Sequence, residues 1–384
     1  MTSEADTDAP ASFPPRPAGG NAERTAARQL AQTLRDRYSS AAIETFWLRP
    51  NWALAQALNV LVAVAGSLVS VGSPRAGAIV LVVALLSILA DWVLQRSPGR
   101  LLARERASQN VVCPAPAPEG GPPDAASAQV TLVLTATYDT PRSGLARRIA
   151  ALRPLSGLSA PGWVGWLLVL GAVALLTALL RQAGHTGTLL DTAQIVATAL
   201  LVVAAALLAE LAIAPAAAHK AADDAPARTV LAIARSLAVA PPANLAVSVV
   251  LTGAGDAYGA GLRHHLRSRR DSLSVTNAVV VGIASGGEGP PRWLHGDGAL
   301  QPLRFWPQLT EIATRVAGGD PQLGFTPERR HGCSAPLPAR MRGLPAIALA
   351  GDPGQVAHAA LLLIDEVDIH VGRIRPRRRP GSPQ

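Results

Sequence analysis

The sequence predicts an α/β domain, with a mostly parallel sheet flanked by helices, joined to four transmembrane helices in two hairpins. The 384-residue chain is 49% hydrophobic and has a mean hydropathy of +0.25, which is too apolar for an ordinary soluble protein of this length. Four long apolar runs account for much of this excess. Between the two pairs of runs and after the second pair, β-branched segments alternate with helical patterns, which is typical of a parallel sheet covered on both faces.

The N-terminal 50 residues precede the first apolar run. Residues 1–21 are rich in Pro, Ala, Gly, Ser and acidic residues without apolar periodicity, which predicts a disordered tail and no signal peptide. Residues 22–50 are predicted as a juxtamembrane segment. Its helix, up to about residue 39, places Leu30 and Leu34 on one face. We expect this helix to lie along the membrane surface, and an ordinary solvated helix is the alternative.

Residues 51–96 and 161–214 are the predicted hairpins. The first contains spans at 52–72 and 76–95, and the second contains spans at 162–180 and about 191–213. Each run is near the ~20 residues that cross a bilayer core of ~30 Å. The alternative is four buried core helices in a large soluble domain.

Arginine is distributed unevenly around the spans. The two tight hairpin loops offer only Arg75 and Arg181, and the remaining arginines lie outside them. The positive-inside rule therefore predicts that both termini and the soluble domain are cytoplasmic, in a bacterial inner membrane. Tryptophans at the predicted cytoplasmic ends agree with this orientation: Trp47, Trp52, Trp92, Trp163 and Trp166.

The net charge of +9 comes almost wholly from arginine, because Lys220 is the single lysine. Nucleic-acid binding is one interpretation of a pI near 10.9. A GC-rich genome and a membrane surface explain the same bias, so we expect the lipid bilayer as a partner and no nucleic acid. The two cysteines, Cys113 and Cys333, lie far apart beside loop-like sequence and predict free thiols.

The soluble domain is predicted to comprise residues 108–160 and 215–373, with a basic tail at 374–384. The expected strands are 110–112, 130–138, 244–254, 277–285 and 344–351, and the expected helices are 142–152, 226–239, 259–270, 307–317 and 355–372. The strand at 130–138 delivers Asp139 to its carboxyl end, where open α/β sheets keep their chemistry.

Three motifs follow one another around this strand. Thr-Tyr-Asp at 137–139 ends it, Ala-Ala-Asp-Asp at 221–224 opens a helix, and Gly-Ala-Gly-Asp at 253–256 ends the next strand. A Gly-Leu-Pro-Ala segment at 343–346 opens the last strand. In this order the chain resembles the co-catalytic zinc aminopeptidases of peptidase family M 28, over about residues 108–373.

The resemblance implies a site whose metal ligands are largely replaced. The family has His-x-Asp at the first strand end, a bridging aspartate, and then a general-base glutamate followed by a ligand glutamate. Asp139, Asp223 and Asp256 take ligand positions here, Thr137 replaces the histidine, and Gly255 stands at the general-base position. The family's next ligand, an aspartate, falls at Gly282, Ala284 or Ser285 in this sequence. Its last ligand, a histidine, falls near residues 334–336, where this sequence has no histidine and His331 lies slightly upstream.

This substitution pattern changes the expected chemistry. Zinc sites need imidazole and carboxylate ligands, whereas an oxygen-only set favours Mg, Ca or Mn. Loss of a general base costs roughly 10²–10⁴-fold in rate. We expect no catalytic residue and no cofactor, with a divalent metal held by Asp139, Asp223 and Asp256 as the alternative. Each aspartate also has an ordinary explanation as a turn or helix cap.

Other motifs give weaker indications of function. His264-His265 lies in a basic helix face that is usually solvated, and 282–289 is a glycine-rich loop without a phosphate-loop lysine. His331 and Cys333 are too close in sequence to form a productive pair, and no Gly-x-Ser-x-Gly elbow is present.

The favoured interpretation is a non-catalytic aminopeptidase relative that binds an unknown protein or peptide partner through the former cleft, or acts as a scaffold. The second hairpin, inserted between Asp139 and Asp223, is expected to press the former catalytic face toward the bilayer. A residual metallohydrolase is the alternative. A membrane transport component is a second alternative, disfavoured because the spans carry few central polar groups, mainly Gln56, Asn59 and Gln194.

Overall fold

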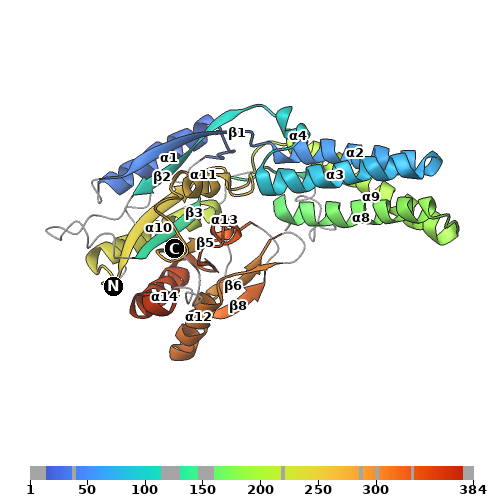
Figure 1. Ribbon diagram of the computed structural model, residues 1–384. Helices are drawn as coiled ribbons and strands as arrows, with labels where there is room; N and C mark the ends of the chain where they lie inside the picture. Colours follow the sequence, from blue (N-terminus) through green and yellow to red (C-terminus); the bar gives the residue numbers. More distant parts are fainter. Residues whose placement is uncertain are drawn as a thin grey trace.

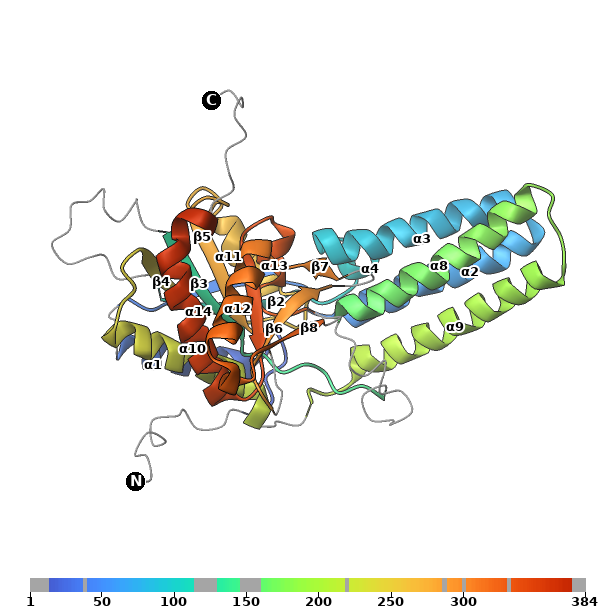
Figure 2. The same ribbon diagram turned by 90° about the horizontal axis from the view of Figure 1, so that it is seen from below.

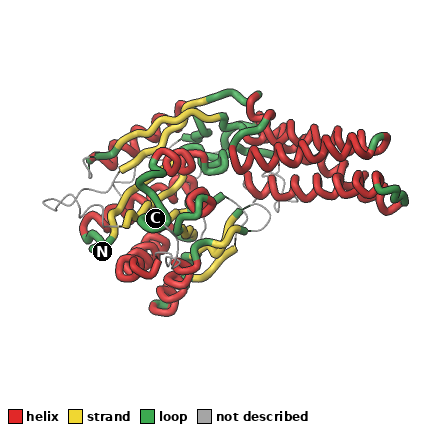
Figure 3. The backbone as a smooth tube through the Cα atoms, in the orientation of Figure 1, coloured by secondary structure: helices red, strands yellow, loops and turns green. Residues whose placement is uncertain are grey.

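The computed structural model describes residues 14–36, 40–113, 130–145, 160–217, 221–284, 289–298, 302–329 and 333–374. Within these residues a nine-stranded sheet is covered by helices, and a bundle of four long helices projects from it (Figure 1). The tube in Figure 3 separates the strand-containing domain from the all-helical bundle. The predicted fold class, an α/β domain with four apolar helices, is confirmed.

The sheet has a parallel centre and antiparallel edges. Its order is β1-β2-β4-β3-β5-β9-β6-β7, with β8 paired to β6. Strands β4, β3, β5 and β9 run parallel, whereas β1, β2, β6 and β7 pair antiparallel along the order. The strands are β1 Ala42–Leu48, β2 Arg106–Cys113, β3 Val130–Thr137, β4 Leu245–Thr252, β5 Ala278–Ile283, β6 Arg292–Asp297, β7 Leu303–Arg304, β8 Thr326–Arg329 and β9 Ala346–Ala350.

Helices cover both faces of this sheet. One face carries α1 Asn21–Arg35, α10 Ala221–Val239, α12 Pro307–Gly319 and α14 Pro353–Ile374, and the other carries α11 Ala260–Ser268 and α13 Leu337–Met341. A short 3₁₀ helix, η3, spans Pro321–Leu323. The alternation along β3 explains the arrangement, because Leu132 and Leu134 pack with the first group of helices while Val133 packs with the second. Burial of each such side chain stabilises the fold by roughly 1.5–3 kcal/mol.

The bundle contains α2 Trp52–Gly72, α3 Pro74–Leu94, α8 Ala160–Gln182 and α9 Thr188–Ile213, each long and apolar enough to cross a membrane. A one-turn helix, α4 Pro98–Leu101, follows α3. The contacts form a closed ring, α2 to α3 to α8 to α9 and back to α2. Figure 2 shows both hairpin turns at the end of the bundle far from the sheet.

Small and polar residues allow the bundle helices to approach closely. A Cβ atom on Gly77 would lie 2.3 Å from the Cβ atom of Ser70, so α3 meets α2 almost backbone to backbone. Gln194 donates from Nε2 to the Ser67 carbonyl at 2.7 Å and to Ser70 Oγ at 2.9 Å. Large apolar side chains such as Leu61 and Leu86 are 53% and 59% exposed on the outside, which suits contact with lipid tails.

The N-terminal segment differs from its prediction. Residues 14–20 fall in the predicted tail, yet Arg16 among them is fully buried. Helix α1 buries Ala27, Leu30 and Leu34 in the core of the sheet domain, so its apolar stripe covers the sheet and not the membrane surface. Residues 42–48, expected in the juxtamembrane segment, form β1 and pair antiparallel with β2.

Strand β1 also explains a second difference. His264 stacks on Phe46 with ring centroids 4.8 Å apart, and His265 Nδ1 lies 3.0 Å from Glu44 Oε2. The predicted solvated histidine face is therefore wrong, because β1 covers that flank of α11. Cys113 and Cys333 form no disulfide, as predicted. The expected helix at 142–152 lies outside the described residues from 146 onward, and the basic tail lies outside them after 374.

Candidate functional site

The candidate site lies where β3 and β4 end. The chain leaves β3, returns on one side as β4, and then crosses to the other side of β3 as β5. Loops that leave such neighbouring strands border the crevice in which open α/β sheets place their ligands. Asp139 follows β3, and residues 253–259, which we call the β4 loop, follow β4.

The Asp139 side chain is hydrogen-bonded to the β4 loop. Its side chain is 8% exposed, and its two carboxylate oxygens accept from the backbone amides of Gly255 at 2.7 Å and Asp256 at 3.0 Å. Desolvation, together with the charge of Asp256, raises the pKa of Asp139 to about 6 despite these hydrogen bonds. The carboxylate therefore fastens one strand end to the next, and it does not cap the turn that follows it.

Gly255 and Thr137 fit each other closely. A Cβ atom on Gly255 would lie 2.3 Å from Thr137 Cγ2 and 2.8 Å from Asp139 Oδ1. Contacts of this length do not occur between real side chains, so residue 255 must lack a side chain while Thr137 keeps its methyl group. These are the two positions at which the resemblance expects a general base and a ligand histidine.

A cation from the N-terminal segment occupies the far side of the β3 end. Arg16 Nε donates to the Tyr138 carbonyl at 2.5 Å, and Arg16 Nη2 pairs with Asp224 Oδ1 at 2.5 Å. The side chains of Arg16 and Asp224 are 0% and 5% exposed. The Arg16 backbone also pairs with Thr140 in both directions. The guanidinium therefore supplies the positive charge that the buried Asp224 carboxylate needs.

Glu23 secures the other end of the β4 loop. Its buried carboxylate accepts from Ser108 Oγ at 2.9 Å, from the Ala254 amide at 3.0 Å, and from the Gly19 amide at 2.6 Å. Desolvation raises the pKa of Glu23 to about 8, and the charge of Asp139 adds to this increase. The raised pKa favours the protonated form of Glu23 near neutral pH, and the side chain is held behind the loop and away from solvent.

The β4 loop is bent tightly. Ala254 and Tyr258 adopt left-handed backbone conformations with φ of 53° and 59°, and Gly259 has φ of 65°. Non-glycine residues in this region cost roughly 1–3 kcal/mol each, so the surroundings must hold the loop in place.

The helical bundle provides part of that restraint. Trp52 Nε1 donates to Asp256 Oδ2 at 3.4 Å, Gln56 Nε2 donates to the Tyr258 hydroxyl at 3.0 Å, and Gln95 Nε2 donates to the Ala257 carbonyl at 3.0 Å. These donors come from the domain-facing ends of α2 and α3. The β4 loop is therefore fixed between the bundle on one side and Glu23 and Asp139 on the other.

A charged pair reinforces this junction inside the bundle. Asp91 is fully buried on α3 and accepts from Arg100 Nε at 2.7 Å, Arg100 Nη2 at 2.9 Å and Gln56 Nε2 at 3.2 Å. The Arg100 guanidinium also lies 5.2 Å from the centre of the Tyr258 ring. Bundle and site loop thus share one hydrogen-bonded network.

Two of the three predicted ligands, Asp139 and Asp256, lie in the described part of the chain with their side chains. Asp139 and Asp256 are neighbours, but both oxygens of Asp139 already bind backbone amides. The side chain of Asp223 and all of His331 lie outside the described residues. Within those residues no group of three His, Cys, Asp or Glu side chains is placed to hold a metal ion. The side chains that the structure describes therefore do not by themselves fit a dinuclear zinc centre.

A thiol mechanism finds little support either. Desolvation and the nearby charge of Asp297 raise the pKa of Cys333 to about 12, so the nucleophilic thiolate is scarce at neutral pH.

Sequence reasoning missed Arg16, Glu23 and Asp224. Arg16 sits in a proline-rich stretch with no periodic signal. Glu23 had a weak sequence signal, since it lies three residues after Gly20, the N-cap of α1. An acidic residue at this position often accepts a hydrogen bond from a backbone amide that precedes the helix. Asp224 is the second aspartate of a pair in which the resemblance favoured the first.

We compared the chain with known protein families, curated proteins and solved structures. No protein-family model matches the chain, and no curated relative does. The solved structures similar to it include a glutaminyl cyclase from an Acidobacteriales bacterium, at 10% identity and a TM-score of 0.43 over 95% of this chain and 90% of that one. A zinc aminopeptidase from Bacillus subtilis matches at 10% identity and a TM-score of 0.39 over 93% and 91%.

A TET aminopeptidase from a marine sediment thaumarchaeon matches at 14% identity and a TM-score of 0.31. The match covers 38% of this chain and 48% of that one, so the chain spans about half the length of that enzyme. The likenesses are at the level of the fold: this chain is similar to zinc aminopeptidases and glutaminyl cyclases.

Proposed function

We propose that this chain is a multi-pass membrane protein whose aminopeptidase-like domain acts by binding and not by catalysis. The observation that carries the proposal is the buried ion pair between Arg16 and Asp224. Asp224 neighbours the position at which the resemblance expects a bridging ligand, and its charge is neutralised by a cation of the same chain. A side chain that already pairs with a guanidinium is a poor ligand for a metal ion.

Two further features support the proposal. Residue 255 has no space for a general base while Thr137 lies against it. Asp139 holds backbone amides with both oxygens and is nine-tenths buried. Three of the expected site positions, residues 137, 139 and 255, thus have structural roles that interlock.

The binding role follows from where the N-terminal segment lies. Residues 14–23 line the ends of β3 and β4 through Arg16 and Glu23. A protein or peptide partner that engages the former cleft must displace this segment, whereas a partner on another surface leaves it in place. Arg16→Met with Asp224→Asn loosens this segment without leaving an unpaired buried charge, so it separates the two modes: affinity increases in the first and is unchanged in the second.

We also propose that the sheet domain faces the cytoplasm. Of the two arginines at the far hairpin turns, Arg181 is paired with Asp191 at 2.5 Å, which leaves less net positive charge at that end than at the domain end. Cysteines introduced as His185→Cys at the far end and Gly318→Cys on the domain test this in intact cells. A membrane-impermeant maleimide is expected to label position 185 alone, and labelling of position 318 alone would reverse the orientation.

The test of the non-catalytic proposal uses the full chain in detergent. Aminoacyl p-nitroanilides and a peptide with N-terminal glutamine are supplied in turn with Zn²⁺, Mn²⁺ and Mg²⁺, and Asp139→Ala serves as the control. We expect no turnover above the control with any metal. Turnover that Asp139→Ala abolishes would instead support the residual hydrolase that uses Asp139, Asp223 and Asp256.

Transport through the bundle has no comparable support. The central polar side chains Gln56, Asn59 and Gln194 each hydrogen-bond within the chain, and α2, α3, α8 and α9 close on one another as a packed ring.

A further inference from the structure

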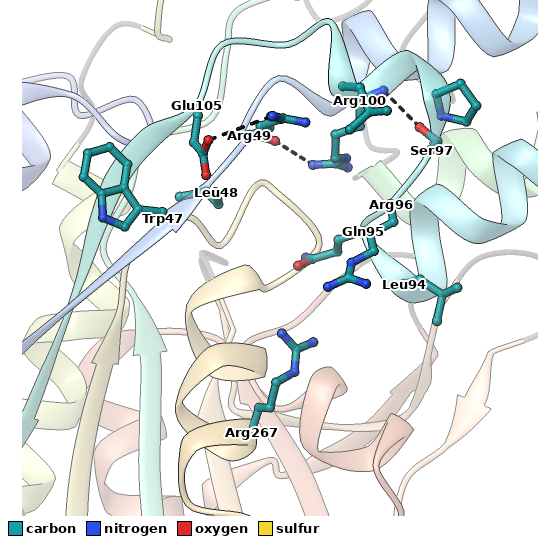
Figure 4. Close-up of a pocket in the computed structure, with 12 residues that line it drawn as sticks. Trp47, Leu48, Arg49, Leu94, Gln95, Arg96, Ser97, Arg100, Glu105 and Arg267 are labelled. Atoms are coloured by element: carbon teal, nitrogen blue, oxygen red, sulfur yellow. Dashed lines mark hydrogen bonds and ion pairs between the residues drawn. The ribbon is translucent and has the colours of Figure 1, made fainter.

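A pocket of about 700 Å³ opens where the bundle meets the edge of the sheet (Figure 4). Its walls come from the end of β1, the segment from Leu94 to Leu101, and the end of α11. Span α3 ends at Leu94 after 21 residues, about the ~30 Å thickness of a bilayer core, so the pocket begins at the level of lipid headgroups.

The pocket is strongly cationic. Four arginines line it, Arg49, Arg96, Arg100 and Arg267, and Glu105 is the one acidic residue among its described lining residues. Arg100 is neutralised by Asp91, and Arg49 reaches Glu105 only loosely, at 3.9 Å. Neither Arg96 nor Arg267 forms an ion pair within the described part of the chain, and Figure 4 shows their guanidinium groups pointing toward one another.

Both arginines are exposed and can reach a ligand, and an anion that binds between them gains from both positive charges. The backbone holds Arg96 there, since the preceding Gln95 has a left-handed φ of 55° and its side chain is tied to the Ala257 carbonyl. Guanidinium groups bind phosphate with two parallel hydrogen bonds, so a phosphate-bearing anion is the ligand that this geometry suits.

Apolar side chains at the pocket identify the source of the phosphate. Trp47, Leu94 and Leu101 line the pocket with exposures of 70%, 60% and 69%. A small soluble anion would make no apolar contact with these side chains. The glycerol and acyl chains of a lipid lie at this depth of the membrane and would contact them, and tryptophan is also favoured at this depth.

We propose that this pocket binds the phosphate headgroup of an anionic membrane phospholipid, held between Arg96 and Arg267 with its acyl chains along Leu94 and Leu101. The site rests on the proposed membrane insertion of the bundle. Since Gln95 joins the pocket to the β4 loop, bound lipid also braces the junction between bundle and domain.

The test compares variants of the full chain reconstituted in bilayers of phosphatidylglycerol and phosphatidylcholine, with retained lipid counted by native mass spectrometry. Each arginine near a membrane surface contributes about fivefold to anionic lipid affinity, so Arg96→Gln with Arg267→Gln should lower the preference for phosphatidylglycerol about 25-fold. Arg235→Gln with Arg270→Gln removes the same charge from exposed arginines of the sheet domain outside the pocket and should lower it by less than about threefold.

Three results would overturn the proposal. Equal loss in both double variants would assign the preference to general surface charge. Displacement of lipid by soluble glycerol phosphate at comparable concentration would make the site one for soluble anions. Extraction of the chain by alkaline carbonate would contradict membrane insertion and this site together, whereas an integrated chain with unchanged lipid preference contradicts the site alone.

Discussion

Removing the Arg16 charge should destabilise the sheet domain strongly. In Arg16→Met the side chain keeps its apolar stem, but the Asp224 carboxylate, 5% exposed, loses its cation. Breaking a buried ion pair by removing one partner costs about 3–5 kcal/mol. For a domain of this size each kcal/mol lowers the melting temperature by roughly 2–4 °C, so a decrease of roughly 6–20 °C is expected in thermal unfolding followed by circular dichroism.

The second partner provides the control. In Arg16→Met with Asp224→Asn no charge remains buried, and most of the lost stability should return because replacing both partners of a buried pair is often nearly neutral. A single variant that melts within about 2 °C of the parent would show that the pair is not buried as described. A double variant no more stable than the single one would show that Arg16 acts through other contacts.

Two further predictions concern the same site. The raised pKa values of Glu23 and Asp139 mean that the folded state binds protons that the unfolded state releases. The stability that these two groups contribute is therefore fully present below about pH 4 and falls by a few kcal/mol as pH rises to about 8. Glu23→Gln should flatten this fall in melts between pH 5 and pH 9, and an unchanged slope would contradict the assignment. Gly255→Ala should lower the free energy of unfolding by about 1–3 kcal/mol because its Cβ atom would lie 2.3 Å from Thr137. The control is Gly318→Ala, whose Cβ atom would have nothing within 4 Å and which should be neutral or slightly stabilising. Equal melting temperatures for the two variants would contradict the tight packing at Gly255.

The central elements were predictable because their signals are local. The apolar runs at 52–72 and 191–213 and the β-branched run at 130–138 carry their own periodicity, and the structure contains α2, α9 and β3 there. The parallel direction of β3, β4 and β5 followed from the alternation of strands and helices.

The N-terminal segment was not predictable in this way. Arg16 lies 208 residues from Asp224, and nothing near either residue indicates the other. Residues 42–48 were interpreted as part of a membrane-proximal segment because Trp47 and Arg49 look interfacial, although they form β1 and pair antiparallel with the distant strand β2. Long-range pairing of this kind overrides local pattern.

The positions of two site residues were predictable from the sequence, but their contacts were not. Asp139 and Asp256 were placed correctly at adjacent strand ends, since carboxyl ends of parallel strands meet at one edge of the sheet. The role of Asp139 as a hydrogen-bond acceptor for backbone amides depends on the left-handed turn at Ala254, which no residue type in the sequence required.

The most direct test of the central claim is the metal content of the full chain, purified in detergent, exposed to Zn²⁺, Mn²⁺ and Mg²⁺, and desalted before elemental analysis. The parent, Asp139→Ala and Asp223→Ala are measured together. Because Arg16 neutralises Asp224 and backbone amides hold Asp139, we expect all three proteins to retain the same substoichiometric metal. One or two metal ions per chain in the parent, lost in both variants, would contradict the claim and identify a metallohydrolase site.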